Sequence, residues 1–347
     1  MLRLKSLVIP LAIAGAATAV SAAEWQSLPS KAPAPADNPT TADKVKLGKI
    51  LFLDPRLSST GTVSCNSCHN VMLGGEDNRP VAMGVKGQVG GRSAPTVWNS
   101  AFNSVQFWDG RAPSLEEQAK GPVTNPIEMG MKSWADVEKR LAAIPGYPEL
   151  FEAAFGDGAE VSEDNAAKAI AAYERTLITP NSPYDNYVNG DKKALTDQQV
   201  RGMELFEKTG CTNCHSGPAF LGPEMEAGKG FFMKFPTFKN GYFEAKYKFR
   251  KDGGRFAETK DEADRDMFKV PTLRNIALTA PYFHNGAVAK LDTAVKVMAK
   301  LQLDKTLSKE QTEDIVAFLE SLTGKFPKQT LPQLPGTPTE TFNYVVK

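Results

Sequence analysis

The sequence predicts a mainly α-helical protein made of two small domains related by internal duplication, with few and short strands. Three observations support this prediction. Apolar residues recur at helical spacing through most of the chain, a Cys-x-x-Cys-His motif occurs twice, and the residues around the two motifs repeat in a common register. We therefore expect one helical domain around each motif.

The first 22 residues have the pattern of a secretory signal peptide. Arg3 and Lys5 form a basic start, an apolar stretch follows, and a small-residue cleavage site ends at Ala22. The apolar stretch is short for a membrane span, although an uncleaved anchor is the alternative. No later stretch is long and apolar enough to cross a bilayer. The pattern predicts export to the periplasm without a membrane span.

Cleavage after Ala22 leaves a nearly neutral chain of two domains. Loss of Arg3 and Lys5 reduces the 41 basic residues to 39 against 40 acidic ones, which argues against nucleic-acid binding. The predicted parts are a linker (23–41), an N-terminal heme domain (42–190), a C-terminal heme domain (191–325) and a Pro-rich tail (326–347).

Both Cys-x-x-Cys-His motifs carry the attachment signature of c-type heme, in which two thiols bond the heme and the histidine binds its iron. They use every cysteine of the chain, so no disulfide is expected: Cys65, Cys68 and His69; Cys211, Cys214 and His215. Zinc or a redox Cys-x-x-Cys is the alternative, but a zinc site would need further Cys or His ligands nearby. We predict two covalently bound c-type hemes.

Capping signals place two helices of the second half. Thr196 with Gln199 forms a capping box, and Gly210 ends that helix just before the second motif. Ser308 with Gln311 forms another capping box before a helix with one apolar face.

The internal repeat extends beyond the heme motifs. Gly48 precedes the first motif in a Gly-x-x-Leu-Phe pattern, as Gly202 precedes the second. Pro-Thr-x-x-Asn follows each motif and ends at Asn99 and at Asn275, with a glycine eleven residues after each asparagine. A shared register of this length argues against chance and indicates duplication.

The repeat exposes a difference between the two hemes. Met298 lies where a thioether closes the iron of a cytochrome c, whereas the matching position in the first half is Pro122, which cannot bind iron. Gln118 and Glu128 lie nearby. Met298 could instead fill a core, and Glu128 alone could be a solvated surface residue. The pattern favours one closed iron and one iron open to chemistry.

Trp108 and His284 occupy the same position of the repeat. Trp108 either fills the core or lies between the hemes and couples them. His284 is either a distal ligand or a hydrogen-bonding loop residue, and spacing does not decide between these two roles.

These residues together resemble the bacterial diheme cytochrome c peroxidases, from about Thr41 to about Leu334. The resemblance rests on the two heme motifs and on five ordered segments: FWDGRA (107–112), EQAKGPV (117–123), IEM (127–129), PTLRN (271–275) and PYFHNG (281–286).

The resemblance implies a role for each candidate residue. The heme on His69 would be peroxidatic, and the heme on His215 and Met298 would transfer electrons. Catalytic roles fall to three residues: Glu128 and Gln118 over the peroxide-binding face, and Trp108 between the hemes. The implied reaction reduces hydrogen peroxide to water with electrons from a small cytochrome c or a copper protein. Relatives also suggest a homodimer.

A calcium ion between the domains is a further expectation from the family. Thr279 and Pro281 match positions that bind it through backbone carbonyls. The third ligand is usually an asparagine, and here it is Ser93, which has a shorter reach.

One departure from the family concerns the first heme. In most relatives a histidine follows the residue that matches Gly84, and it caps the peroxidatic iron until the other heme is reduced. In this sequence Val85 occupies that position. Met83, Lys86 or Met72 could substitute as weaker ligands. We expect an open iron and little or no need for reductive activation.

Three questions remain open from the sequence. The basic, aromatic-rich residues 229–256 form either a cover over the second domain or a docking patch for an acidic donor.

A diheme electron carrier without a substrate is the first rival function. An oxidase that modifies a protein partner is the second, but relatives with that activity replace the methionine ligand by tyrosine, so Met298 favours the peroxidase.

Overall fold

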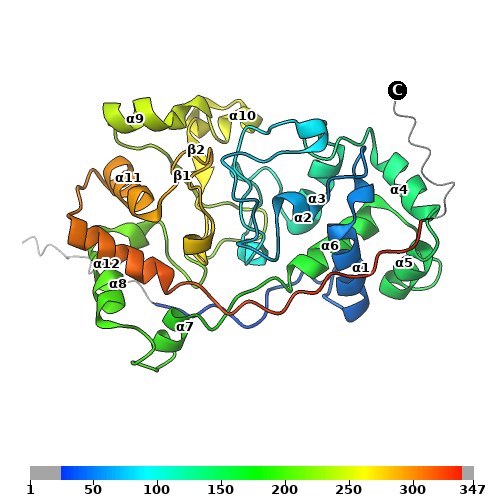
Figure 1. Ribbon diagram of the computed structural model, residues 1–347, viewed down its shortest axis with the longest axis horizontal. Helices are drawn as coiled ribbons and strands as arrows, with labels where there is room; N and C mark the ends of the chain where they lie inside the picture. Colours follow the sequence, from blue (N-terminus) through cyan, green and yellow to red (C-terminus); the bar gives the residue numbers. More distant parts are fainter. Residues whose placement is uncertain (1–24, 338–347) are drawn as a thin grey trace, which may run out of the picture.

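The computed structural model describes residues 25–337, and the predicted signal peptide (1–22) lies outside them. The chain forms two helical halves that lie side by side (Figure 1). The first half contains α1 (Ala42–Leu53), α2 (Cys65–Cys68), α3 (Leu115–Thr124), α4 (Trp134–Ala142), α5 (Tyr147–Phe155) and α6 (Glu163–Glu174). The second contains α7 (Pro183–Val188), α8 (Asp197–Thr209), α9 (Gly241–Tyr247), α10 (Phe256–Thr259), α11 (Leu291–Leu303) and α12 (Lys309–Glu320).

Regular strands are few and short, as predicted. β1 (Phe232–Lys234) pairs antiparallel with β2 (Met267–Lys269), and Phe232 lies opposite Lys269. Short 3-10 turns occupy many of the connections: Pro55–Leu57, Val85–Gly87, Ser100–Phe102, Cys211–Asn213, Phe249–Lys251, Glu262–Asp264 and Ile276–Leu278. The described chain is therefore mainly helical.

One packed helix pair supports each half. α1 packs against α6, and α8 packs against α12. Glycine permits both contacts, because a Cβ at Gly48 would collide with the carbonyl oxygen of Ala169 and a Cβ at Gly202 with that of Asp314. The same Gly-x-x-Leu-Phe pattern thus makes the same close helix approach in both halves.

Three apolar clusters form the cores. One fills the first half around α1, α5 and α6, and the second joins α8 to α12 around Phe206 and Phe318. The third lies under α9 and α11. Tyr184 of α7 is fully buried in the second cluster, so α7 packs with the second half although the sequence analysis placed it in the first.

The two terminal segments cross between the halves. Trp25 packs edge-on against Tyr184, and the Leu28 N–H donates to Asp185, so the described start of the chain lies on the second half. The end returns to the first half, where Phe326 packs edge-on against Trp98. Figure 1 shows these segments, blue and red, running along the lower edge of the molecule. The regions predicted as linker and tail therefore tie the halves together.

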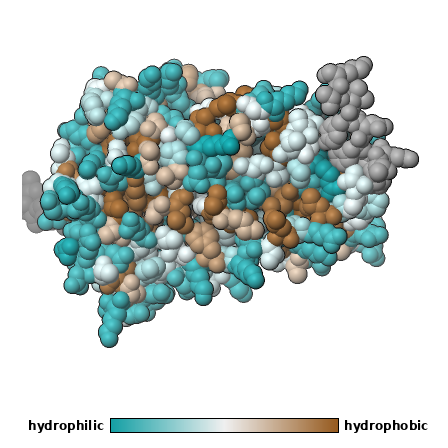
Figure 2. Space-filling model, in the orientation of Figure 1, coloured by the Kyte–Doolittle hydropathy of each residue, from teal (hydrophilic) through white to brown (hydrophobic). Residues whose placement is uncertain are grey.

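Hydrophilic residues dominate the outline of the face in Figure 2, and apolar residues gather in patches across its middle. None of the described helices has the length and apolar character that a membrane span requires.

Candidate active site

The first heme motif forms the single-turn helix α2 and presents His69 at its end. The His69 Nδ1–H donates to the carbonyl oxygen of Pro95 at 2.9 Å, which leaves Nε2 as the nitrogen that can bind iron. Burial lowers the pKa of His69 and favours the neutral imidazole, the form that binds a metal.

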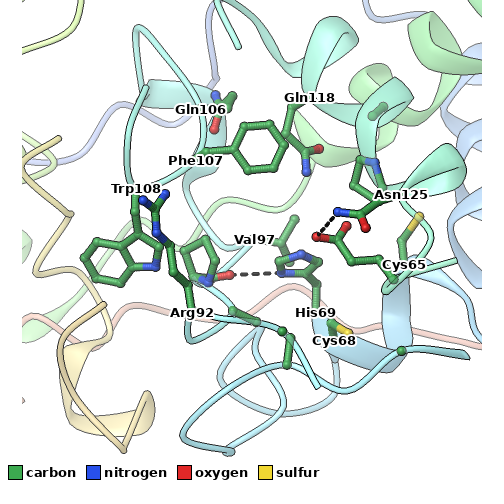
Figure 3. Close-up of a pocket in the computed structure, with 18 of the residues that line it drawn as sticks. Cys65, Cys68, His69, Arg92, Val97, Gln106, Phe107, Trp108, Gln118 and Asn125 are labelled. Atoms are coloured by element: carbon green, nitrogen blue, oxygen red, sulfur yellow. Dashed lines mark hydrogen bonds between the residues drawn. The ribbon is translucent and has the colours of Figure 1, made fainter. Parts of the chain in front are cut away.

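A cavity of about 510 Å³ opens beside this motif. Cys65, Cys68 and His69 line it together with three residues predicted for the active site: Trp108, Gln118 and Glu128. In Figure 3 the Phe107 ring and the Gln118 amide lie across the cavity from the His69 imidazole. The structure thus brings the predicted attachment and catalytic residues of the first half into one cavity.

The cavity fits a covalently attached heme. Much of its lining is apolar, and the hydroxyl of Ser100 is buried in its wall with no hydrogen-bond partner among residues 25–337. Burial raises the pKa of Cys65 to about 12 and that of Cys68 to about 11, so both free thiols stay protonated. Covalent attachment of heme through these thiols stays a prediction.

Glu128 lies in the loop after α3 and is held at both its side chain and its backbone. Its carboxylate accepts a hydrogen bond of 3.1 Å from the Asn125 amide, drawn in Figure 3, and its carbonyl oxygen accepts one of 2.8 Å from the Val85 N–H. Burial raises the pKa of Glu128, and the positive charge of Arg111 partly opposes this rise.

Val85 holds its loop against the backbone of Glu128. Its side chain is buried and packs over Gly130. Gly84 lets the two backbones approach, because a Cβ there would collide with the carbonyl oxygens of Ile127 and Glu128.

The other candidate caps of the first iron face outward. Met83 is 40% exposed, with its sulfur 3.4 Å from an Arg79 nitrogen, and Met72 is 49% exposed. Lys86 is exposed as well.

Trp108 lies at the contact between the halves. Its indole N–H donates to the Ser93 carbonyl oxygen at 2.9 Å, and its ring packs edge-on against His284 at 6.3 Å between centroids. His284 is buried, stacks on Phe268 and shares a hydrogen bond of 3.1 Å with the Phe249 carbonyl. His284 is thus a hydrogen-bonded loop residue.

The second motif is braced by a buried arginine. The His215 Nδ1–H donates to the Phe220 carbonyl oxygen at 3.1 Å, which again leaves Nε2 for iron. Arg274 holds the same loop by donating to the Pro218 carbonyl at 2.6 and 2.8 Å, and it pairs with Asp185 at 2.8 Å. Burial raises the pKa of Cys211 to about 12, and Cys214 shows the same direction.

Met298 is half-buried on α11. Leu291 and Val295 of the same helix pack on the cluster that includes Cys211, and Met298 packs on the neighbouring cluster that includes Trp108. Leu291, Val295 and Met298 follow helical spacing and share one face. Ligation of iron by Met298 stays a prediction.

The predicted calcium ligands lie at the boundary between the halves. The Ser93 N–H donates to the His284 carbonyl oxygen, and Pro281 lies three residues before His284. The Ser93 carbonyl is already bound to Trp108, and calcium takes six to eight oxygen ligands. Among residues 25–337, no three His, Cys, Asp or Glu side chains form a metal-binding group. The predicted ligands include backbone carbonyls, which such a group does not require, so calcium binding at Ser93, Thr279 and Pro281 stays a prediction.

Several residues that line the cavity were not predicted as site residues from the sequence. Phe107 and Arg111 stack with 3.5 Å between the guanidinium carbon and the ring centroid, and both line the cavity. Their spacing within FWDGRA gives no sign of this contact, because an intervening turn creates it. Asn125 lies three residues before Glu128 in a turn that follows α3, where the Glu128 N–H donates to the Asn125 carbonyl oxygen at 3.1 Å. Buried Glu174 also lines the cavity, and burial raises its pKa to about 8.

The chain is similar to known proteins both in sequence and in fold. Residues 42–193 match the model of the family described as di-haem cytochrome c peroxidase. The chain is 46% identical over 309 residues to the cytochrome c551 peroxidase of Nitrosomonas europaea, which covers 89% of this chain and 88% of that protein. It is 45% identical over 339 residues to the cytochrome c551 peroxidase of Pseudomonas aeruginosa, covering 97% and 95%. A solved MauG-like protein associated with microbial copper homeostasis has a TM-score of 0.74 at 30% identity, over 86% of this chain and 95% of that chain.

Proposed function

The chain belongs to the di-haem cytochrome c peroxidase family, and from this premise we propose that it reduces hydrogen peroxide to water in the cavity beside His69. The reaction is H2O2 + 2 H+ + 2 e− → 2 H2O, with electrons from a small cytochrome c or a copper protein. One observation carries the proposal: Glu128 and Gln118 line the same cavity as the first heme motif. We expect two covalently attached c-type hemes, a homodimer and a periplasmic location, the last from the predicted signal peptide.

Cys65, Cys68 and His69 would hold the first heme, which would supply the redox chemistry that peroxide reduction needs. The Glu128 carboxylate accepts a proton from one peroxide oxygen and returns it to the other, so that water leaves. Such positioned proton transfer contributes on the order of 10²–10⁴ in rate. The raised pKa of Glu128 makes it a stronger base than a solvated carboxylate, and the Gln118 amide orients the peroxide.

Trp108 is the proposed link between the two hemes. Its contact with His284 and its packing in the cluster that also contacts Met298 support this role, because they connect the first cavity to the helix of the second heme's predicted ligand. The Ser93 carbonyl fixes the indole orientation.

The first iron is proposed to be open in the oxidised enzyme. Val85 has no metal-binding group, and its side chain is buried over Gly130. The exposure of Met83 and Met72 supports the same conclusion. We therefore propose that the enzyme needs little or no reductive activation.

Turnover of a Glu128→Gln variant tests the proposed function. The assay follows peroxide-dependent oxidation of a reduced small cytochrome c by the holoenzyme. Glu128→Gln should lose about 10²–10⁴ in rate, because an amide cannot accept the proton. Glu152→Gln, at an exposed glutamate of α5, is the matched control and should retain the wild-type rate. Equal rates for both variants would show that Glu128 is not the proton acceptor. No turnover by the wild type would favour an electron carrier or an oxidase that acts on a protein.

A further inference from the structure

A second cavity of about 300 Å³ adjoins the first and shares part of its lining. The residues common to both are Phe107, Arg111, Pro122, Asn125 and Glu128. We infer that this second cavity is the entrance through which peroxide reaches Glu128, and that the Phe107–Arg111 stack limits it to hydrogen peroxide and small alkyl hydroperoxides. The inference rests on the proposed function, since it assumes that peroxide reacts beside Glu128.

The lining of the second cavity runs from the surface inward. Pro113 and Gly121 are exposed, and the Glu117 side chain is 50% exposed, whereas Glu128 is partly buried at the wall of the heme cavity. A molecule entering between the exposed residues therefore meets the Glu128 carboxylate before the heme motif. Small polar peroxides suit this path, because charged and amide side chains line it.

Phe107 and Arg111 stack on each other in the wall of this path. The Arg111 guanidinium lies over the Phe107 ring and is fixed by the buried carboxylate of Asp109 at 2.9 and 3.1 Å. Phe107 itself has φ of 69°, in the left-handed region, and the surrounding turn is closed by a bridge between Gln106 and Ala112. Such a backbone persists only where its surroundings determine it. The backbone of Phe107 is therefore fixed, and its ring is covered by the Arg111 guanidinium.

Gly121 faces this stack from α3. A Cβ added there would lie 3.7 Å from the tip of the Phe107 ring. A larger side chain at position 121 would extend into the remaining gap, whereas loss of the Phe107 ring would widen it. The reaction remains ROOH + 2 H+ + 2 e− → ROH + H2O for every substrate, with R = H for hydrogen peroxide and the electrons from the same external donor.

Two variants of the holoenzyme test the inference in opposite directions. Gly121→Leu should lower kcat/KM for tert-butyl hydroperoxide by about tenfold or more, and by less for hydrogen peroxide. Leucine also has a higher helix propensity than glycine, so α3 should persist. Phe107→Ala should raise the rate with cumene hydroperoxide relative to hydrogen peroxide by a similar factor. Gly241→Leu, at an open position on α9, is the matched control and should change neither ratio.

Ligand entry provides a readout that is independent of turnover. Stopped-flow absorbance of the first heme should show Gly121→Leu slowing the binding of imidazole more than that of cyanide. Size-dependent changes in both experiments support the entrance, whereas unchanged or size-independent ratios in both variants overturn it. Gly121→Leu could slow imidazole binding more than cyanide binding while the wild type does not reduce peroxide. That result would contradict the proposed function and leave the entrance supported.

Discussion

The backbone N–H of Val85 donates to the carbonyl oxygen of Glu128 at 2.8 Å. Val85, which the sequence analysis predicts to leave the first iron without a histidine cap, thus holds the backbone of the proposed proton acceptor. Gly84 allows this approach, because any larger residue would collide with the same carbonyl. The loop that carries Gly84 and Val85 therefore holds the backbone of Glu128 in place.

Gly84→Ala should displace the Glu128 segment and lower kcat/KM for peroxide by about tenfold to a hundredfold, since misplacing a catalytic group by about 1 Å can have effects of this size. Gly91→Ala in the same loop is the control, because a Cβ there meets nothing within 4 Å. Steady-state kinetics and the heme absorbance of both variants check this prediction. Equal activity of the two variants would show that the contact does not position Glu128.

The pH dependence of kcat/KM should report the raised pKa of Glu128. Only the ionised carboxylate accepts a proton, so activity should fall with decreasing pH through a pKa above the ordinary glutamate value of about 4.3. Arg111→Leu removes the charge that lowers this pKa, so the acid limb should move to higher pH. If the acid limb moves to lower pH in Arg111→Leu, or is still present in Glu128→Gln, it belongs to a group other than Glu128.

Arg274→Leu should destabilise the second half by about 3–5 kcal/mol, because it leaves the Asp185 charge buried and unpaired. The loop that orients His215 should loosen as well. Denaturant unfolding followed by circular dichroism and heme absorbance measures both effects. Arg201→Leu breaks a more exposed pair with Asp314 and should change stability little. Similar unfolding midpoints for the two variants would contradict the structural role of Arg274.

Glu76 should make stability decrease with rising pH. Burial raises its pKa to about 7, so the folded state keeps a proton that the unfolded chain releases near its ordinary pKa of about 4.3. Its contribution is fully present below that unfolded pKa and is lost as pH rises through about 7. The melting temperature of Glu76→Gln should therefore fall less than that of the wild type between about pH 5 and pH 8. If the melting temperatures of the wild type and of Glu76→Gln change equally with pH, the titration of Glu76 does not contribute to stability.

Local signals in the sequence predicted much of the framework. The capping boxes at Thr196 and Ser308 and the left-handed Gly210 are present as predicted, because they depend on neighbours only a few residues away. Equivalent repeat positions also share backbone geometry: Asn99 and Asn275 have φ of 63° and 61°. The prediction of heme attachment also rests on a fixed local spacing, and it stays a prediction.

The walls of the candidate site were less predictable because they form between distant segments. The Arg111–Phe107 stack depends on a turn fixed by buried Asp109, and the Val85–Glu128 contact joins residues 43 positions apart. Hydrophobic periodicity describes helix faces, but most of these residues lie in loops whose path is set by tertiary contacts. The packing of α7 with the second half was missed for the same reason, since its burial depends on the distant α8 and α12.

The most direct test of the account compares peroxide turnover from fully oxidised enzyme with turnover after pre-reduction. Each reaction uses the same reduced small cytochrome c as donor. An open first iron predicts equal, immediate turnover from both starting states, because Val85 provides no ligand to displace. A lag or absence of activity that pre-reduction removes would contradict the account, since it would show that another residue caps the iron bound at His69.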